Sequence, residues 1–174
     1  MKKICFIAPS GYGKSTAIKL LSEICVIKNI KIAEPLYYLQ NYFYKYINKE
    51  MIGEQDGELL QFLGAKIRKH NQTFLIEEFT KNLNAINDND ILITNDDCRP
   101  ADYDQLKKLG FVFVGISGYC RNRIDQTKPD PTHNLEWQND MPCDLYINNF
   151  GSLAEYKIEL KKLLTKINGN NYER

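Results

Sequence analysis

Residues 3–16 read KICFIAPSGYGKST, and this stretch decides the fold of the chain. Its first half is an apolar run that predicts a buried strand over 3–8, and its second half is a turn with two glycines that leads into Gly-Lys-Ser-Thr. An amphipathic helical pattern follows, expected over 14–24. A strand, a glycine-bearing turn and a helix in this order predict a phosphate-binding loop.

The residue types of this loop suit polyphosphate binding. Glycine is needed where φ is unusual or the ligand comes close, which Gly11 and Gly13 supply, and the first turn of the helix points its N–H groups at the anion. Lys14 would reach the β- and γ-phosphates of ATP, and the Ser15 hydroxyl would ligate Mg²⁺. Ala8 replaces the first glycine of the pattern and asks for an ordinary backbone conformation there. The residues expected to bind ATP are Ser10, Gly11, Tyr12, Gly13, Lys14, Ser15 and Thr16.

Length and composition fit a small soluble enzyme, which we expect in the cytoplasm. The 174 residues fit one domain over 1–174, long enough to bury a core. A net charge of +1 gives no global attraction for a nucleic-acid polymer or an anionic membrane, so we expect neither as a partner. No apolar run approaches the roughly 20 residues that span a bilayer. We expect no signal peptide, because the phosphate loop begins within the first ten residues.

The cysteines are scattered and odd in number. They form no Cys-x-x-Cys pair, which disfavours both a zinc site and a disulfide framework, and a reducing cytosol is their simplest environment. The five are Cys5, Cys25, Cys98, Cys120 and Cys143.

Short apolar runs alternate with longer amphipathic ones along the chain, which predicts an α/β domain. Candidate strands are 3–8, 29–33, 90–95, 111–116 and 143–147. Candidate helices are 14–24, 35–49, 57–69, 72–86, 101–109 and 152–167. With the phosphate loop, the pattern predicts the three-layer P-loop NTPase fold with a central parallel sheet of about five strands.

Carboxylates follow the apolar run 90–95. Parallel sheets place ligand chemistry at the carboxyl ends of their strands, so Asp96 or Asp97 is expected beside the phosphate loop, where it could serve Mg²⁺. The sequence leaves open which of the two does so.

The aromatic stretch 35–47 allows two interpretations. Its five tyrosines could stack on a nucleobase, since every base offers a π-face. The favoured interpretation is that they close a core while their hydroxyls reach water, with one or two at most touching ligand.

A polar loop over 118–136 follows the strand 111–116. Arg121 and Arg123 on a mobile loop that closes over bound nucleotide would place positive charge on the transferring phosphoryl group. The alternative is that these arginines only solvate an exposed loop.

The order of motifs over 90–167 resembles a known family. A strand ending in Asp96 is followed by Arg99, Asp102, Lys-Lys-Leu-Gly and another strand. An arginine-bearing loop with Thr132-His133-x-x-Glu136 comes next, and DLYINNFGSL (144–153) leads into the last helix. This arrangement resembles the nucleoside monophosphate kinases among P-loop proteins, most of all the deoxynucleoside monophosphate kinases of bacteriophages. Dephospho-coenzyme A kinases and phosphomevalonate kinases are similar but more distant.

The resemblance implies a site for each substrate. ATP and Mg²⁺ would be held by the phosphate loop, with Ser15 and Asp96 or Asp97 on the metal. The catalytic residues would be Lys14, Arg99, Arg121 and Arg123. The acceptor would be bound from substrate-side helices over 35–86 and from the strand end, by Glu34, Gln61, Arg68 and Arg99.

Parts of this comparison depart from the pattern or stay open. Tyr37 stands where relatives often carry a lysine, and Asp96-Asp97-Cys98-Arg99 is one residue longer than Asp-x-Arg if Asp96 is the counterpart. A lid over 118–140 is expected, in which the roles of His133 and Glu136 stay open.

The leading hypothesis is therefore an ATP- and Mg²⁺-dependent (deoxy)nucleoside monophosphate kinase. A dephospho-coenzyme A kinase or another small-molecule kinase is the second hypothesis, and a non-catalytic P-loop nucleotide-binding protein is the third. The sequence does not determine the oligomeric state, so a homodimer stays an open alternative.

Overall fold

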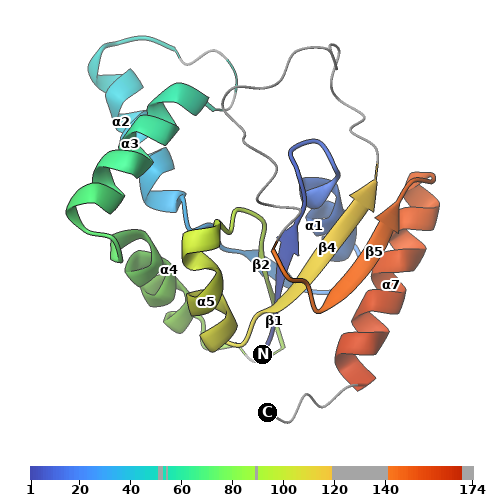
Figure 1. Ribbon diagram of the computed structural model, residues 1–174. Coiled ribbons are helices and arrows are strands. Elements are labelled where there is room, and N and C mark those ends of the chain that lie inside the picture. The colour runs from blue at the N-terminus through green and yellow to red at the C-terminus, as the bar shows by residue number, and fades with distance from the viewer. Residues whose placement is uncertain (51–52, 54, 89, 119–140, 170–174) are drawn as a thin grey trace. The chain divides into compact units, whose positions relative to one another are not determined.

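The structure is a computed structural model that describes residues 1–50, 53, 55–88, 90–118 and 141–169 (Figure 1). The chain divides into two compact units. The sheet unit contains the described residues of 1–29, 88–118 and 141–169, and the helical unit contains those of 30–87. That the whole chain is one domain over 1–174 stays a prediction.

The sheet unit is built on five parallel strands in the order β2-β3-β1-β4-β5. β1 occupies the centre, where it pairs with both β3 and β4. The predicted parallel sheet is thus confirmed, and the carboxyl ends of all five strands lie along one edge. The strands are β1 (Lys2–Ile7), β2 (Ile27–Asn29), β3 (Leu92–Asn95), β4 (Val112–Gly118) and β5 (Leu145–Asn149).

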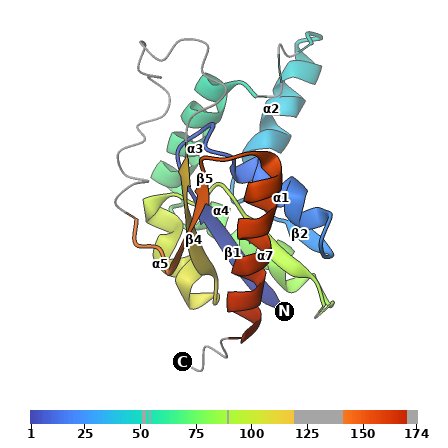
Figure 2. The ribbon, with the colours of Figure 1, turned by 90° about the vertical axis from the view of Figure 1, so that its right-hand side faces the viewer.

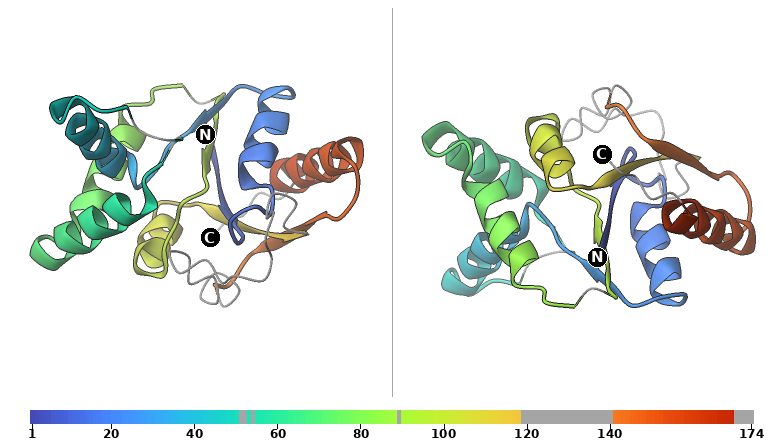
Figure 3. Two further views of the ribbon diagram at one scale, coloured as in Figure 1. Left: turned by 90° about the horizontal axis from the view of Figure 1, so that it is seen from above. Right: turned by 90° about the horizontal axis from the view of Figure 1, so that it is seen from below.

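Helices cover both faces of this sheet, as Figures 2 and 3 show. Helices α1 (Lys14–Ser22) and α7 (Leu153–Gly169) pack side by side on one face. Alternate residues of β1 point into the core below them, with Ile4 and Phe6 at most 1% exposed. Helix α5 (Pro100–Lys108) covers the opposite face, where the Tyr103 ring lies 4.3 Å from that of Phe113. These three layers confirm the predicted P-loop fold.

The helical unit consists of α2 (Glu34–Tyr46), α3 (Gly57–His70) and α4 (Phe74–Asn84), which contact one another. Helix α4 buries Leu75, Phe79 and Leu83, one residue per turn along a single stripe. Where α2 and α3 approach, Gly64 has no side chain, and a Cβ there would meet Leu36 at 3.4 Å.

Several boundaries differ from the sequence expectation by two or more residues, and the second strand differs most. The strand expected over 29–33 lies at Ile27–Asn29 and shares only Asn29 with that range, and Ile30 and Ile32 are buried outside the sheet. The last helix continues to Gly169, beyond the expected end at residue 167. Within the described ranges, no helix combines the length and apolar character that crossing a bilayer requires.

Candidate functional site

The loop between β1 and α1 has the geometry expected of a phosphate loop. Gly11 has φ 81° and Gly13 has φ 99°, a backbone conformation that side-chain-bearing residues rarely adopt. Helix α1 begins at Lys14, with no side-chain cap on its first turn and no acidic residue in it. No carboxylate of that turn therefore competes with an anion for its first N–H groups, which suits phosphate binding.

Lys14 folds back over the start of the loop. Its Nζ donates hydrogen bonds to the carbonyl oxygens of Ala8, at 2.5 Å, and Pro9, at 3.1 Å. Among the described non-glycine residues, only Asn48 has a positive φ, so Ala8 takes the ordinary conformation predicted for it. The backbone at the start of the loop thus holds the Lys14 ammonium.

Asp96 and Asp97 directly follow β3, the neighbour of β1. Because Asn95 at the end of β3 is in register with Cys5 of β1, both carboxylates lie at the edge from which the phosphate loop leaves. Asp96 Oδ1 accepts a hydrogen bond from Asn29 Nδ2 at 3.2 Å, and the Asn29 side chain in turn accepts one from Thr94 at 3.1 Å.

Asp97 is held by the last residue of β3. Its Oδ1 accepts from Asn95 Nδ2 at 2.7 Å, and its backbone N–H donates to Asn95 Oδ1 at 3.3 Å. Asn95 is fully buried and also accepts from the Cys5 thiol at 3.4 Å. Burial raises the pKa of Cys5, which keeps it a neutral donor.

The donor types at this edge suit Mg²⁺. Hydroxyl and carboxylate oxygens are the ligands that this ion prefers, and it is usually bound by one or two carboxylates together with substrate phosphates. No cluster of three or more His, Cys, Asp or Glu side chains arranged for a metal occurs in the described part of the chain. Ser15 with Asp96 or Asp97 therefore remains the predicted metal set, and the choice between the two carboxylates stays open.

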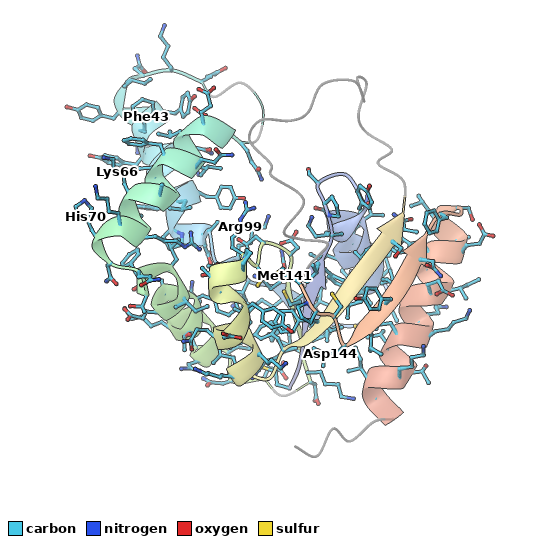
Figure 4. The ribbon with its side chains drawn as sticks, in the orientation of Figure 1. Phe43, Lys66, His70, Arg99, Met141 and Asp144 are labelled. Carbon is cyan, nitrogen blue, oxygen red and sulfur yellow. The ribbon has the colours of Figure 1, made fainter. Side chains whose placement is uncertain are left out.

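Arg99 is the residue from which α5 starts, as Figure 4 shows, and its side chain is exposed. Its carbonyl accepts from the N–H of Asp102 at 2.8 Å, and Pro100 fixes the first turn. The guanidinium is thus carried on a rigid helix start close after β3.

The other predicted acceptor residues belong to the helical unit. Glu34 opens α2 and accepts from Asn82 of α4 at 3.1 Å, Gln61 is exposed on α3, and Arg68 is half-buried in the last turn of α3. Their joint role with Arg99 stays a prediction. Arg121, Arg123, His133 and Glu136, like the whole expected lid from 119 onward, lie outside the described residues.

The core interpretation of the aromatic helix is wrong for three of its tyrosines. Tyr38, Tyr42 and Tyr46 are 72%, 59% and 79% exposed, and Phe43 beside them, labelled in Figure 4, is 44% exposed. The buried residues of α2 are instead Leu36 and Gln40.

The reason lies in a polar junction. Gln40 is 1% exposed, and its Oε1 accepts from the Asp56 N–H at 2.8 Å. The Asp56 carboxylate caps α3 by accepting from Leu59 N at 3.0 Å and also accepts from the Tyr44 hydroxyl at 2.8 Å. This network turns the stripe of residues 36, 40 and 44 inward and leaves 38, 42 and 46 outside.

Two residues not among the predicted site residues contact the phosphate loop. Asn149, the last residue of β5, donates from Nδ2 to the Tyr12 carbonyl at 3.0 Å. Tyr156 of α7 donates from its hydroxyl to the Gly13 carbonyl at 3.3 Å. Asn149 belongs to the motif 144–153 that carries the family resemblance, so its position at a strand end was the available signal.

No protein-family model and no curated protein matches the sequence. Solved structures do match. The shikimate kinase of Aquifex aeolicus is similar with a TM-score of 0.54 and 17% identity, covering 99% of each chain. The shikimate kinase of Acinetobacter baumannii in complex with shikimate gives 0.54 and 13%, covering 99% of this chain and 96% of that one. At these identities the likeness shows the fold alone, which this chain shares with these two kinases.

Proposed function

We propose that this protein is a kinase that transfers the γ-phosphoryl group of ATP to a small molecule, with a (deoxy)nucleoside monophosphate as the acceptor. The observation that carries the proposal is the loop 8–15, with positive φ at both glycines and the Lys14 ammonium against its opening carbonyls. Its position at the carboxyl edge of a parallel sheet, next to two carboxylates, adds support.

In this proposal the chain acts by positioning and charge. The loop N–H groups bind the donor phosphates, and Lys14 leaves the Ala8 and Pro9 carbonyls to contact the β- and γ-phosphates. Ser15 and Asp96 or Asp97 would hold Mg²⁺, which neutralises charge on those phosphates. A phosphate oxygen of the acceptor then bonds to the γ-phosphorus as the bond to the β,γ-bridging oxygen breaks. ADP and a nucleoside diphosphate are the products.

The acceptor assignment rests on the arginines and on the family resemblance. Arg99 and Arg68 offer the planar fork that binds a phosphate in bidentate fashion, and Glu34 and Gln61 could bind the nucleoside. The matching shikimate kinases keep other small acceptors open. A dephospho-coenzyme A kinase is one such alternative, and a P-loop protein that binds nucleotide without transferring phosphoryl groups is another.

A coupled assay of ADP release tests the proposal. The acceptors are all ribo- and deoxyribonucleoside monophosphates, dephospho-coenzyme A and shikimate, each with and without Mg²⁺. We expect ADP release to depend on one or a few monophosphates. Turnover only with another acceptor would replace the substrate class, and slow hydrolysis of ATP that no acceptor stimulates would favour the non-catalytic alternative.

A further inference from the structure

We propose that Asn149 and Tyr156 are positioning residues that brace the phosphate loop in its ligand-accepting shape. This inference rests on the proposed function, because it concerns the loop that would bind the donor. It gives a role to the end of the motif 144–153, which the proposed reaction leaves without one.

Asn149 reaches the loop from the end of β5. The residue is 6% exposed, and its amide nitrogen donates to the Tyr12 carbonyl at 3.0 Å. A Cβ on Gly13 would stand 2.4 Å from that same nitrogen, so the amide occupies the space that a side chain at position 13 would need. Gly118, the partner of Asn149 in the β4–β5 pair, also packs against it, though less closely: a Cβ there would lie 3.0 Å from the Asn149 carbonyl oxygen. The strand end therefore fixes the amide in place.

Tyr156 reaches the next peptide of the loop from a different element. Its side chain is 1% exposed in the core between α1, α7 and the sheet, and its hydroxyl donates to the Gly13 carbonyl at 3.3 Å. Burial raises the pKa of this hydroxyl well above its usual value, so it stays protonated and able to donate.

The start of α7 is fixed by its own capping interaction. Ser152 N–H and Oγ–H both donate to the Glu155 carboxylate, at 2.7 and 2.9 Å, and the Glu155 N–H donates back to Ser152 Oγ at 3.3 Å. This reciprocal cap sets where the helix begins. Tyr156, the next residue, is thereby placed under the loop.

Holding these two carbonyls orients the donors that a phosphate would meet. In a planar trans peptide the C=O and N–H point in opposite directions. Turning the Tyr12 carbonyl toward Asn149 therefore aims the Gly13 N–H away from β5. The Gly13 carbonyl also accepts from the Ala17 N–H of α1 at 2.8 Å, so the Tyr156 hydroxyl supplements the helical bond that sets the direction of the Lys14 N–H. Donors fixed before binding avoid the cost of ordering the loop around the ligand.

Two pairs of variants test the brace. Asn149→Asp keeps the shape of the side chain but places a carboxylate oxygen against the Tyr12 carbonyl. Its control is Asn148→Asp, which adds the same charge at the exposed neighbouring position. Tyr156→Phe removes only the hydroxyl, and its control is Tyr103→Phe, which removes a hydroxyl that donates to the Pro142 carbonyl at 3.0 Å, away from the loop. Binding of Mg·ATP and of inorganic tripolyphosphate is measured by calorimetry, and circular dichroism checks folding.

We expect Asn149→Asp to weaken both ligands about tenfold and Tyr156→Phe about threefold, the range of one net hydrogen bond, while both controls stay within twofold of wild type. In the kinase assay the KM for ATP rises while the KM for the acceptor is unchanged.

If folded Asn149→Asp and Tyr156→Phe bind tripolyphosphate as tightly as wild type, with or without a lower Tm, the two residues do not brace the loop. The proposed function is unaffected by that result. If Asn149→Asp does not fold, the tyrosine pair decides. If the wild-type protein binds neither Mg·ATP nor tripolyphosphate, both the brace and the proposed function are contradicted, because the loop then does not bind phosphate.

Discussion

Lys14 Nζ lies 2.5 Å from the carbonyl oxygen of Ala8, the residue that stands in place of the first glycine of the phosphate-loop pattern. The ammonium is therefore held by the backbone of the loop it serves, next to where the phosphates would bind. When the donor binds, Lys14 would exchange these carbonyl partners for phosphate oxygens. Because the side chain is already ordered, binding would not have to include the entropic cost of fixing it.

Lys14→Ala should lower turnover by two or more orders of magnitude, because the loop has no other side-chain cation to place on the donor phosphates. This corresponds to at least ~2.7 kcal/mol of transition-state stabilisation. Without nucleotide the variant should lose only about 1 kcal/mol of stability, since just the two bonds to Ala8 and Pro9 are removed. Steady-state kinetics and urea unfolding measure the two effects; more than a tenth of wild-type turnover would show that the loop is not the donor site.

The strand-end carboxylates and the arginine after them should give different kinetic signatures. Asp96→Asn or Asp97→Asn, one far more than the other, should raise the Mg²⁺ requirement with little change in the KM of the acceptor. Arg99→Lys should raise that KM without altering Mg²⁺ dependence, because lysine keeps the charge but loses the bidentate fork. Metal and acceptor are titrated separately for the three variants. An unchanged acceptor KM in Arg99→Lys would place the acceptor site elsewhere.

Gly13→Ala should cost more than the same change at Gly110. Both glycines have positive φ, so both variants lose roughly 1–2 kcal/mol from backbone strain. A Cβ at Gly110 meets nothing within 4 Å, whereas at Gly13 it meets Asn149 Nδ2 at 2.4 Å, so only Gly13→Ala disturbs the loop. Urea unfolding should rank the two variants, and ATP affinity should fall in Gly13→Ala alone. Equal stability of the two variants, with ATP affinity unchanged in each, would contradict the close approach of Asn149 to Gly13.

The exposed aromatic side chains of α2 should matter little for stability. Tyr38→Gln, Tyr42→Gln and Tyr46→Gln should each change the free energy of unfolding by no more than about 0.5 kcal/mol, as is usual for surface positions. Phe79→Ala, at a position 1% exposed on α4, should cost about 3–5 kcal/mol. Urea denaturation of the four variants checks the contrast. A large loss of unfolding free energy in Tyr42→Gln would show that Tyr42 belongs to the core, as the sequence suggested.

Local signals determined what could be predicted. The phosphate loop and the strands β1, β3, β4 and β5 were recognisable because glycine pairs and apolar runs act within a few residues. The bounds of β2 were not, because Ile30 and Ile32 are buried without pairing in the sheet, and alternating apolar residues do not reveal that difference. The inward face of α2 was hidden for another reason. Aromatic residues surround the helix, so periodicity selects no face, and the buried position belongs to a polar residue, Gln40.

The contacts of Asn149 and Tyr156 could not be read from the sequence, since each joins residues more than 130 positions apart. A polar residue at the end of a strand indicates that edge of the sheet, but not which backbone carbonyl it meets.

The same separation has a consequence for synthesis of the protein. The phosphate loop leaves the ribosome well before Asn149 and Tyr156, which follow their partners Tyr12 and Gly13 by 137 and 143 positions. A nascent chain thus carries the proposed nucleotide-binding segment long before the residues proposed to brace it are synthesised. The strands β3 and β4, which pair with β1, also come later in the chain. We expect ribosome-bound chains that lack α7 to bind ATP weakly, so that nucleotide binding reports the synthesis of α7.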